Sequence, residues 1–385
     1  MLRLRMNLVI PASFVDIRNP DERRLIDEAT RRGLFVSQHH IEPLGVSGFG
    51  YLNYWRDRGK PVPYSFTKHP ERFEQVWRDY AARWARYGDQ VVWQLGLRGI
   101  ADQPIWAADD AAPKTDAGRG KLISDAMALQ RQIVLDVDTR ENPPMTTTLW
   151  MEGARLHEQG HLRFPPGVAV VFSDNSPGWR LQDDFHQVKR QPDRHYGIYY
   201  HQALWNSGPH LVQGVSPWKM HDIFRQAIQR DSAYYIMMNV SNVREFVLGL
   251  DAASKMLWDF ESFDPKMHLT RWCEQRFGPA ARQAEPCYRR LFDAFVRDDG
   301  SGKRRFMDGD ILGLGQRVTR IVHQRFKKGE RPIVHAPDGL RQRLAMVRRQ
   351  LVPQITIVRP PRPRFSQILV GLPIFPSKLL GVLPS

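Results

Sequence analysis

The chain has few cysteines and no long apolar run. Its two cysteines, Cys273 and Cys287, lie in a helical stretch without a histidine pair at zinc spacing. This excludes a disulfide-stapled scaffold, and we predict no metal site and two structural or free thiols. The apolar C-terminal stretch is interrupted by Pro373, Pro376 and Lys378, so it is too short to span a bilayer. We therefore expect no membrane span.

Acidic residues are also scarce. The chain of 385 residues has 41 Asp and Glu against 56 Lys and Arg, a net charge of +15. This excess suggests a polyanionic partner such as nucleic acid, an acidic lipid surface or an acidic polysaccharide. Because no nucleic-acid-binding module is recognisable, we do not expect nucleic acid. Only about five apolar residues precede Pro11, fewer than the core of a signal peptide needs. The N-terminal sequence therefore does not indicate the cellular compartment of the protein.

Apolar runs of strand type alternate with helix-like stretches over most of the chain. The predicted strands are residues 7–14, 34–40, 91–97, 146–150, 168–172, 196–201 and 234–240. The predicted helices between and after them are residues 20–32, 71–87, 121–137, 153–160, 218–230 and 246–258. Strands joined through helices pair in parallel with right-handed crossovers. We predict an α/β fold, a TIM-type (β/α)8 barrel that lacks its first strand.

The pattern changes after residue 263. Residues 267–277, 280–296 and 313–326 are predicted helices without strands between them, and the chain beyond residue 332 is basic and rich in proline. Proline fixes φ and removes a backbone donor, which excludes regular helix and sheet from the Arg-Pro stretch. We predict a barrel domain, incomplete at its N-terminus, over residues 1–263, a small helical domain over 264–331 and a tail over 332–385.

Polar clusters follow the ends of six of the predicted strands. They contain His39 and His40, Arg98 with Asp102, Glu152, Asp174 with Asn175, His201, and Asn239. The carboxyl ends of barrel strands form the face on which such folds carry their active sites. We therefore expect these side chains to converge on one pocket.

Several of these motifs occur together in the order of a known family. They are Gly96-Leu97-Arg98-Gly99 with Asp102 and Pro104, then Ser173-Asp174-Asn175 with Gly178, then Tyr196 to His201 with Gly208-Pro209, then Asn239-Val240. In this the chain resembles glycoside hydrolase family 115, from about residue 7 to residue 277. The resemblance implies a xylan α-1,2-glucuronidase that removes glucuronic acid, or its 4-O-methyl form, with inversion and without a cofactor. The implied partner is an acidic polysaccharide or oligosaccharide such as glucuronoxylan.

The resemblance places the catalytic carboxylates at Asp102 and Glu152. Inverting hydrolysis uses one carboxylic acid and one carboxylate about 6.5–9.5 Å apart, a separation that neighbouring strand ends can supply. The sequence does not assign acid and base between the two. Each residue also has a structural alternative, because Glu152 could cap its short helix and Asp102 could serve as a turn residue.

The substrate-binding candidates are His39, His40, Arg98, Asp174, Asn175, His201 and Asn239. Arg98 could hold a uronate carboxylate with its planar fork, or it could be the structural partner of a neighbouring acid. Because His39 and His40 are adjacent, we expect only one of them to point at the site.

The chain also departs from the family pattern. Ser173 stands where family members carry an acid, and Gln103 where they carry a glutamate. The resemblance covers neither the family's first barrel strand nor its flanking domains, including the C-terminal domain on which family dimers rely, so a dimer is not expected. Family members are often exported, but no signal peptide is visible in this chain. The alternative to a hydrolase is therefore a carbohydrate-binding relic that cannot turn over its ligand.

Overall fold

The computed structural model describes most of the first 294 residues. Residues 12, 14, 175–179, 203–213 and 241–242 are outside the description, and of the later chain only 323–325 and 327–329 are inside it. The chain divides into two compact units. The first comprises Met1–His201, Trp218–Asn239 and Ala253–Phe263, and the second Gln202–Pro217, Val240–Ala252 and Asp264–Ser385.

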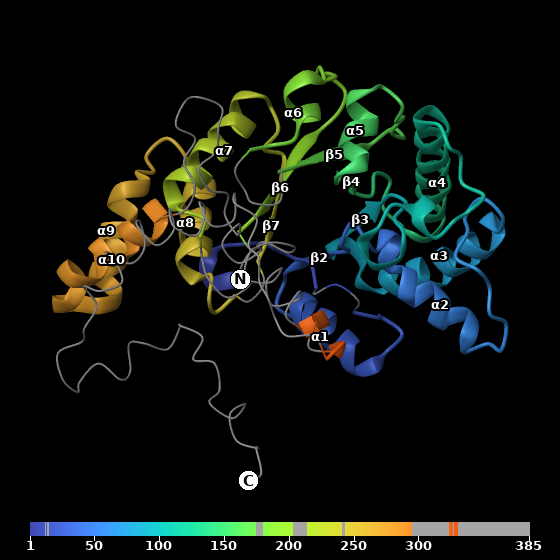
Figure 1. Ribbon diagram of the computed structural model, residues 1–385, viewed down its shortest axis with the longest axis horizontal. Helices are drawn as coiled ribbons and strands as arrows, with labels where there is room; N and C mark the ends of the chain where they lie inside the picture. The colour runs from blue at the N-terminus through green and yellow to red at the C-terminus, as the bar shows by residue number, and fades with distance from the viewer. Residues whose placement is uncertain are drawn as a thin grey trace, which may run out of the picture. The chain divides into compact units, whose positions relative to one another are not determined.

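A parallel sheet of seven strands forms the first unit (Figure 1). The strands are β1 (Leu8–Val9), β2 (Phe35–Ser37), β3 (Val91–Leu95), β4 (Met145–Leu149), β5 (Val168–Ser173), β6 (Tyr196–His201) and β7 (Tyr235–Asn239). They lie side by side in chain order, and every neighbouring pair is parallel. This confirms the seven predicted strands.

The sheet curls into a half-barrel. Ile10, which follows β1, packs against a buried cluster of Val171, Tyr199 and Met237 from β5, β6 and β7. A residue beside the first strand can touch the last three only if the sheet bends round on itself. All six residues of both β5 and β6 are buried, as expected for parallel strands covered on both faces. The predicted fold class, a (β/α) barrel short of one strand, is confirmed.

Helices cover the outside of this half-barrel (Figure 1). They are α1 (Pro20–Arg31), α2 (Gly48–Arg56), α3 (Pro70–Trp84), α4 (Asp116–Val137), α5 (Glu152–Glu158), α6 (Asp183–Gln187) and α7 (Pro217–Gln229). The next helix in the chain, α8 (Val247–Trp258), is divided between the two units. The sequence pattern missed α2 because its two glycines have low helix propensity. This helix is held instead by burial of Tyr51, Tyr54 and Trp55 and by the Ser47 cap. The short α6 was also missed, and α4 begins five residues earlier than predicted.

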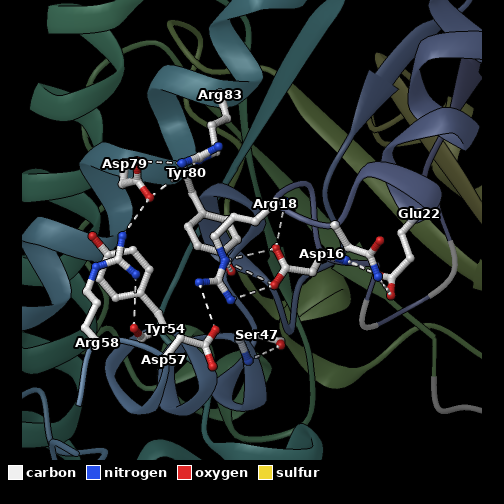
Figure 2. A network of polar contacts seen from close by, with 12 residues as sticks. Asp16, Arg18, Glu22, Ser47, Tyr54, Asp57, Arg58, Asp79, Tyr80 and Arg83 are labelled. Atoms are coloured by element: carbon white, nitrogen blue, oxygen red, sulfur yellow. Dashed lines mark hydrogen bonds and ion pairs between the residues drawn. The ribbon is translucent and has the colours of Figure 1, made fainter. Parts of the chain in front are cut away.

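A polar network joins the loop after β1 to α2 and α3 (Figure 2). Arg18 donates from Nη2 to Oδ2 of Asp16 at 2.9 Å and from Nε to the hydroxyl of Tyr80 at 2.9 Å. Its Nη1 lies 3.5 Å from Asp57, just beyond α2. The largely buried guanidinium thereby fixes three neighbouring segments. A buried charge needs such partners because desolvation without them is costly.

The second unit contains a helix pair. Asp264 caps α9 (Pro265–Phe277) by accepting from the backbone N–H groups of Lys266 and Met267. Trp272 of α9 packs edge-on against Tyr288 of α10 (Ala281–Ala294), with 5.4 Å between the ring centroids.

Several predictions fall wholly or partly outside the described residues. The helix predicted at 313–326 is described only at 323–325, the tail at 332–385 is not described, and the domain boundaries at 263 and 331 stay predictions. Both cysteines are free thiols. Within the described part, no helix is both long and apolar enough to cross a bilayer.

Candidate active site

Arg98 lies at the centre of the candidate site, just beyond β3. Its Nε donates to Oδ1 of Asp102 at 2.9 Å and its Nη2 to the carbonyl oxygen of Asp102 at 2.6 Å. Its Nη1 is hydrogen-bonded to Oε1 of Glu152, the first residue of α5. The hydroxyl of Tyr64 donates a hydrogen bond to the backbone carbonyl oxygen of Arg98 at 2.6 Å and helps to hold the arginine in place. One buried guanidinium thus holds both predicted catalytic carboxylates.

The two carboxylates differ in environment. The side chain of Asp102 is 41% exposed and that of Glu152 is 13% exposed. Burial raises the pKa of Asp102, but His40 and the Arg98 guanidinium outweigh it and lower that pKa from 3.8 to about 2. Nearby positive charge favours the ionised form of a carboxyl group. Asp102 is therefore a carboxylate throughout the neutral range.

Both carboxylates follow unusual backbone. Among the described residues other than glycine, six have positive φ, and three of these are Ala101 at 53°, Asp102 at 59° and Met151 at 50°. Such conformations cost about 1–3 kcal/mol each and tend to cluster at functional sites. A Cβ on Gly99 would meet the carbonyl oxygens of Pro104 and Gln103 at 2.5 and 2.6 Å. The turn that carries Asp102 is therefore tight and needs glycine at this position.

His39 and His40 both join the cluster, contrary to the expectation that only one would. Their ring centroids are 4.2 Å apart. Nε2 of His40 lies 3.4 Å from Oδ1 of Asp102, and Nε2 of His39 lies 3.3 Å from the hydroxyl of Tyr199. The expectation failed because β2 ends at Ser37, so strand alternation no longer governs the two residues. Burial lowers the pKa of both imidazoles.

Asp174 and His201 form a buried pair beyond β5 and at the end of β6. Oδ1 of Asp174 is 2.7 Å from Nδ1 of His201, and Oδ2 accepts the His201 backbone N–H at 2.7 Å. Asp174 is fully buried. These contacts orient the imidazole, with Nδ1 on the carboxylate and Nε2 as the remaining ring nitrogen. Asp174 is placed to act through His201.

Tyr199 and Trp150 connect these groups, and the sequence did not single them out as site residues. The hydroxyl of Tyr199 accepts from Nδ2 of Asn239 at 2.6 Å. The Trp150 ring lies 5.0 Å from His201 and 6.0 Å from His40. Tyr199 belongs to the motif of Tyr196 to His201, and Trp150 is the last residue of the predicted strand 146–150, directly after β4. Their position was the signal that could have identified them.

The predicted site residues that the structure describes form one chain of contacts. Asp102 and Glu152 meet at Arg98, His40 adjoins Asp102, and the aromatic rings lead on to His39, Asn239, His201 and Asp174. Asn175 lies outside the described residues. Within the described part, no group of three or more side chains of the metal-binding types is placed to hold an ion.

Ser173 and Gln103, the two residues that differ from the family pattern, make hydrogen bonds that stabilise the structure. Ser173 is buried, donates to the carbonyl oxygen of Leu149 and accepts from Nε2 of Gln182 at 2.7 Å. The carbonyl oxygen of Gln103 accepts the N–H of Gly99 at 2.7 Å and closes the Asp102 turn. Neither residue offers a carboxylate to the site.

A cavity of about 40 Å³ lies beside Glu152, lined among others by His40, Arg98, Trp150 and Glu152 but not by Asp102. This volume is enough to hold a water molecule. The site therefore combines an ionised carboxylate, Asp102, with a second carboxyl group that has room for water beside it.

Two solved structures share the fold of this chain. The chain can be superimposed on a GH115 4-O-methyl-alpha-glucuronidase, BtGH115A, described as specific for decorated arabinogalactans, with TM-score 0.65 and 18% identity over 92% of this chain and 50% of that one. A GH138 enzyme that targets pectin rhamnogalacturonan II matches with TM-score 0.50 and 12% identity over 92% of this chain and 48% of that one. At these identities the two matches show the fold alone.

The chain spans about half the length of both structures. No curated protein matches it in sequence. The family model described as Glycosyl hydrolase family 115 matches residues 1–297, which is most of the chain. The chain therefore belongs to glycosyl hydrolase family 115.

Proposed function

We propose that the protein is a glycoside hydrolase of α-glucuronidase type, which removes glucuronic acid or its 4-O-methyl form from an acidic glycan by inverting hydrolysis. The observation that carries this proposal is the placement of Asp102 and Glu152 around one guanidinium. Two carboxyl groups facing one bound sugar are the minimum machinery of this reaction. Family membership supports the same class of chemistry.

We assign the base to Asp102 and the acid to Glu152. The low pKa of Asp102 keeps it ionised, so it can accept a proton from water but has none to give near neutral pH. Glu152 is the other carboxyl group held by Arg98, and the role of the acid falls to it by elimination. In the reaction Glu152 protonates the departing glycosidic oxygen while Asp102 takes a proton from the attacking water.

Arg98 can still serve as the clamp for the uronate carboxylate. Its three contacts to Asp102 and Glu152 use one N–H on each nitrogen. This leaves one N–H on each of the two outer nitrogens. A carboxylate could receive both in parallel.

The remaining groups suit the sugar hydroxyls. Nδ1 of both His39 and His40 is buried and makes no hydrogen bond to any described residue. Buried polar atoms without partners are uncommon and call for a functional explanation. His201, oriented by Asp174, and Asn239 complete the set of proposed binding residues, and Asn175 is included from its sequence position alone.

The assignment of roles can be tested with an activated substrate. On 4-nitrophenyl α-glucuronide the leaving group needs no protonation, so Glu152→Gln should keep most of the activity while Asp102→Asn loses it. On a glycan, where the leaving alkoxide needs a proton, both variants should be inactive, since general acid–base groups contribute about 10²–10⁴-fold each. If Glu152→Gln loses activity on 4-nitrophenyl α-glucuronide and Asp102→Asn keeps it, the two roles are reversed. If both variants keep activity on the glycan, neither residue takes part in the mechanism.

The runner-up is a carbohydrate-binding protein without turnover, favoured by Ser173 and Gln103 in place of expected acids. Binding of glucuronoxylan without release of uronic acid is its signature. The glycan also needs to be identified, so the substrate set should include both glucuronoxylan and an arabinogalactan decorated with 4-O-methylglucuronic acid. Release from only one of these would fix the specificity.

A further inference from the structure

A second cleft lies at the opposite end of the strands from the candidate active site. It has a volume of about 410 Å³ and is lined among others by His157, Arg163, Phe164, Lys189 and Arg194. These residues belong to the end of α5 and to the segments that lead into β5 and β6. His201 and Asp174 are at the other ends of the same strands. With six residues in β6, the two sites are roughly 16 Å apart along the strand.

The charge of this cleft is of one sign. Arg163, Lys189 and Arg194 line it, and none of its described lining residues is an aspartate or glutamate. Arg194 donates to the carbonyl oxygen of Val168 at 2.8 Å and of Phe164 at 3.3 Å. These bonds fix the walls of the cleft, and among the described residues Arg194 forms no ion pair. Arg163 and Lys189 are exposed on facing segments.

A buried histidine contributes a further polar group to the wall. Nδ1 of His157 lies 3.2 Å from Oδ2 of Asp184, and both residues are buried. Because the carboxylate holds Nδ1, the other ring nitrogen is the one left for a ligand. Phe164 packs edge-on against the His157 ring at 5.1 Å and adds an apolar surface.

The neighbouring loop strengthens the positive field. Arg190 stacks on Phe172 at 4.2 Å and is hydrogen-bonded to Ser232 and to the carbonyl oxygens of Val188 and Phe185, while the carboxylates of Asp184 and Asp231 act on it through their charge. Burial and the nearby Arg230 lower the pKa of Arg190 to about 10. A concave site lined by one sign of charge concentrates counter-ions.

We propose that this cleft is a second, anion-binding site, which takes a carboxylate or phosphate carried by a molecule of about the size of one sugar. The volume falls within the range of small-molecule sites, about 300–1,000 Å³. Arg163 and Lys189 meet the oxyanion, and Arg194 contributes charge from the wall. This site does not depend on the hydrolase reaction, because none of its polar lining residues belongs to the candidate active site; the two cavities share only the apolar Leu162 among their described lining residues.

The test is calorimetric titration of the full chain with potassium phosphate, with glucuronate, and with neutral xylose. Phosphate, glucuronate or both should bind, and xylose should not bind at this cleft. Glucuronate can also bind at Arg98, so only the part of its binding that the cleft variant removes is assigned to this cleft. If phosphate binds more tightly than that part, the cleft is a phosphate site, and the reverse order identifies a uronate site. The double variant Arg163→Gln/Lys189→Gln should weaken the tighter ligand at least about tenfold, because it removes two charge-assisted hydrogen bonds.

Two control proteins make the outcome decisive. Lys60→Gln/Arg86→Gln makes the same charge change at exposed positions away from the cleft and should change affinity less than about twofold, the size of a general charge effect. Glu152→Gln should leave phosphate binding unchanged. Three outcomes would each overturn the proposal. The two double variants could lose the same affinity, or the cleft variant could lose none. The third outcome is that neither anion binds with a dissociation constant below about 10 mM, which corresponds to a binding free energy of about 3 kcal/mol.

Discussion

The carboxylate of Asp174 holds His201 with both of its oxygens, one on ring Nδ1 and one on the backbone N–H, each at 2.7 Å. Neither residue is exposed by more than 2%. The pair fixes an imidazole among the rings that lead from His201 to His40 and Asp102. The orientation of the His201 side chain, at the end of β6, is therefore determined by Asp174, which follows β5.

Asp174→Asn should weaken both the fold and the activity. The amide can replace only one of the two acceptors and turns its NH₂ toward a donor. We expect the free energy of unfolding to fall by about 1–3 kcal/mol, together with slower hydrolysis, measured by urea denaturation and by release of uronic acid. The matched control is Asp183→Asn, an exposed aspartate paired with Arg180, which should cost less than about 1 kcal/mol. Equal effects in the two variants would contradict the role given to Asp174.

Acid should destabilise the fold through His40. Burial lowers its pKa below the ordinary 6.5, so between these two values the unfolded chain binds a proton that the folded chain does not. Stability is therefore lost as pH falls below about 6.5, by at most about 1.4 kcal/mol per pH unit for this group. Urea denaturation at pH 7 and pH 5 measures the loss. His40→Gln should reduce the pH dependence, and an unchanged slope would exclude His40 as its source.

Gly99 should not tolerate a side chain, whereas Gly153 should. A Cβ on Gly99 meets backbone oxygens at 2.5 and 2.6 Å, but on Gly153 the nearest atom is a Leu149 carbon at 3.9 Å. We expect Gly99→Ala to displace the Asp102 turn and abolish hydrolysis. Gly153→Ala, inside α5, should keep activity and gain up to about 1 kcal/mol of stability. Thermal unfolding and uronic acid release test both, and an active Gly99→Ala would show that the turn is not rigid.

The two thiols should differ in reactivity. Cys273 is buried, and burial raises its pKa to about 11, whereas Cys287 is exposed. The thiolate is the reactive form, so an alkylating reagent at pH 8 should modify Cys287 first. Peptide mass spectrometry of the native protein after brief labelling reports the site. Faster labelling of Cys273 would show that α9 opens readily.

The strands could be predicted well because buried parallel strands are continuous apolar runs, as in β5 and β6. The helix α2 could not, since its glycines conceal a segment that is stabilised by packed aromatic rings. The positions of Arg98, Asp102 and Glu152 at strand ends predicted that they would meet. That Arg98 binds both carboxylates depends on how two loops far apart in the sequence come together. The participation of Tyr199 and Trp150 depends on the packing of aromatic rings. No local sequence pattern encodes either feature.

The joint occupation of the site by His39 and His40 could not be predicted either. It follows from the early end of β2, and strand bounds are uncertain by a few residues in sequence-based reasoning. The second cleft was missed for a similar reason. Arg163, Lys189 and Arg194 lie in three separate parts of two loops, and only the fold brings them together.

The central claim is tested most directly by release of 4-O-methylglucuronic acid from glucuronoxylan and from decorated arabinogalactan by the purified chain and its Glu152→Ala variant. The variant removes one of the three hydrogen bonds of the buried Arg98 side chain and leaves the two to Asp102, so its thermal unfolding is measured beside the assay to establish that it is folded. The proposed function predicts release by the parent chain and none by the variant. Equal release by both, or no release from either glycan by a folded parent chain, would contradict it.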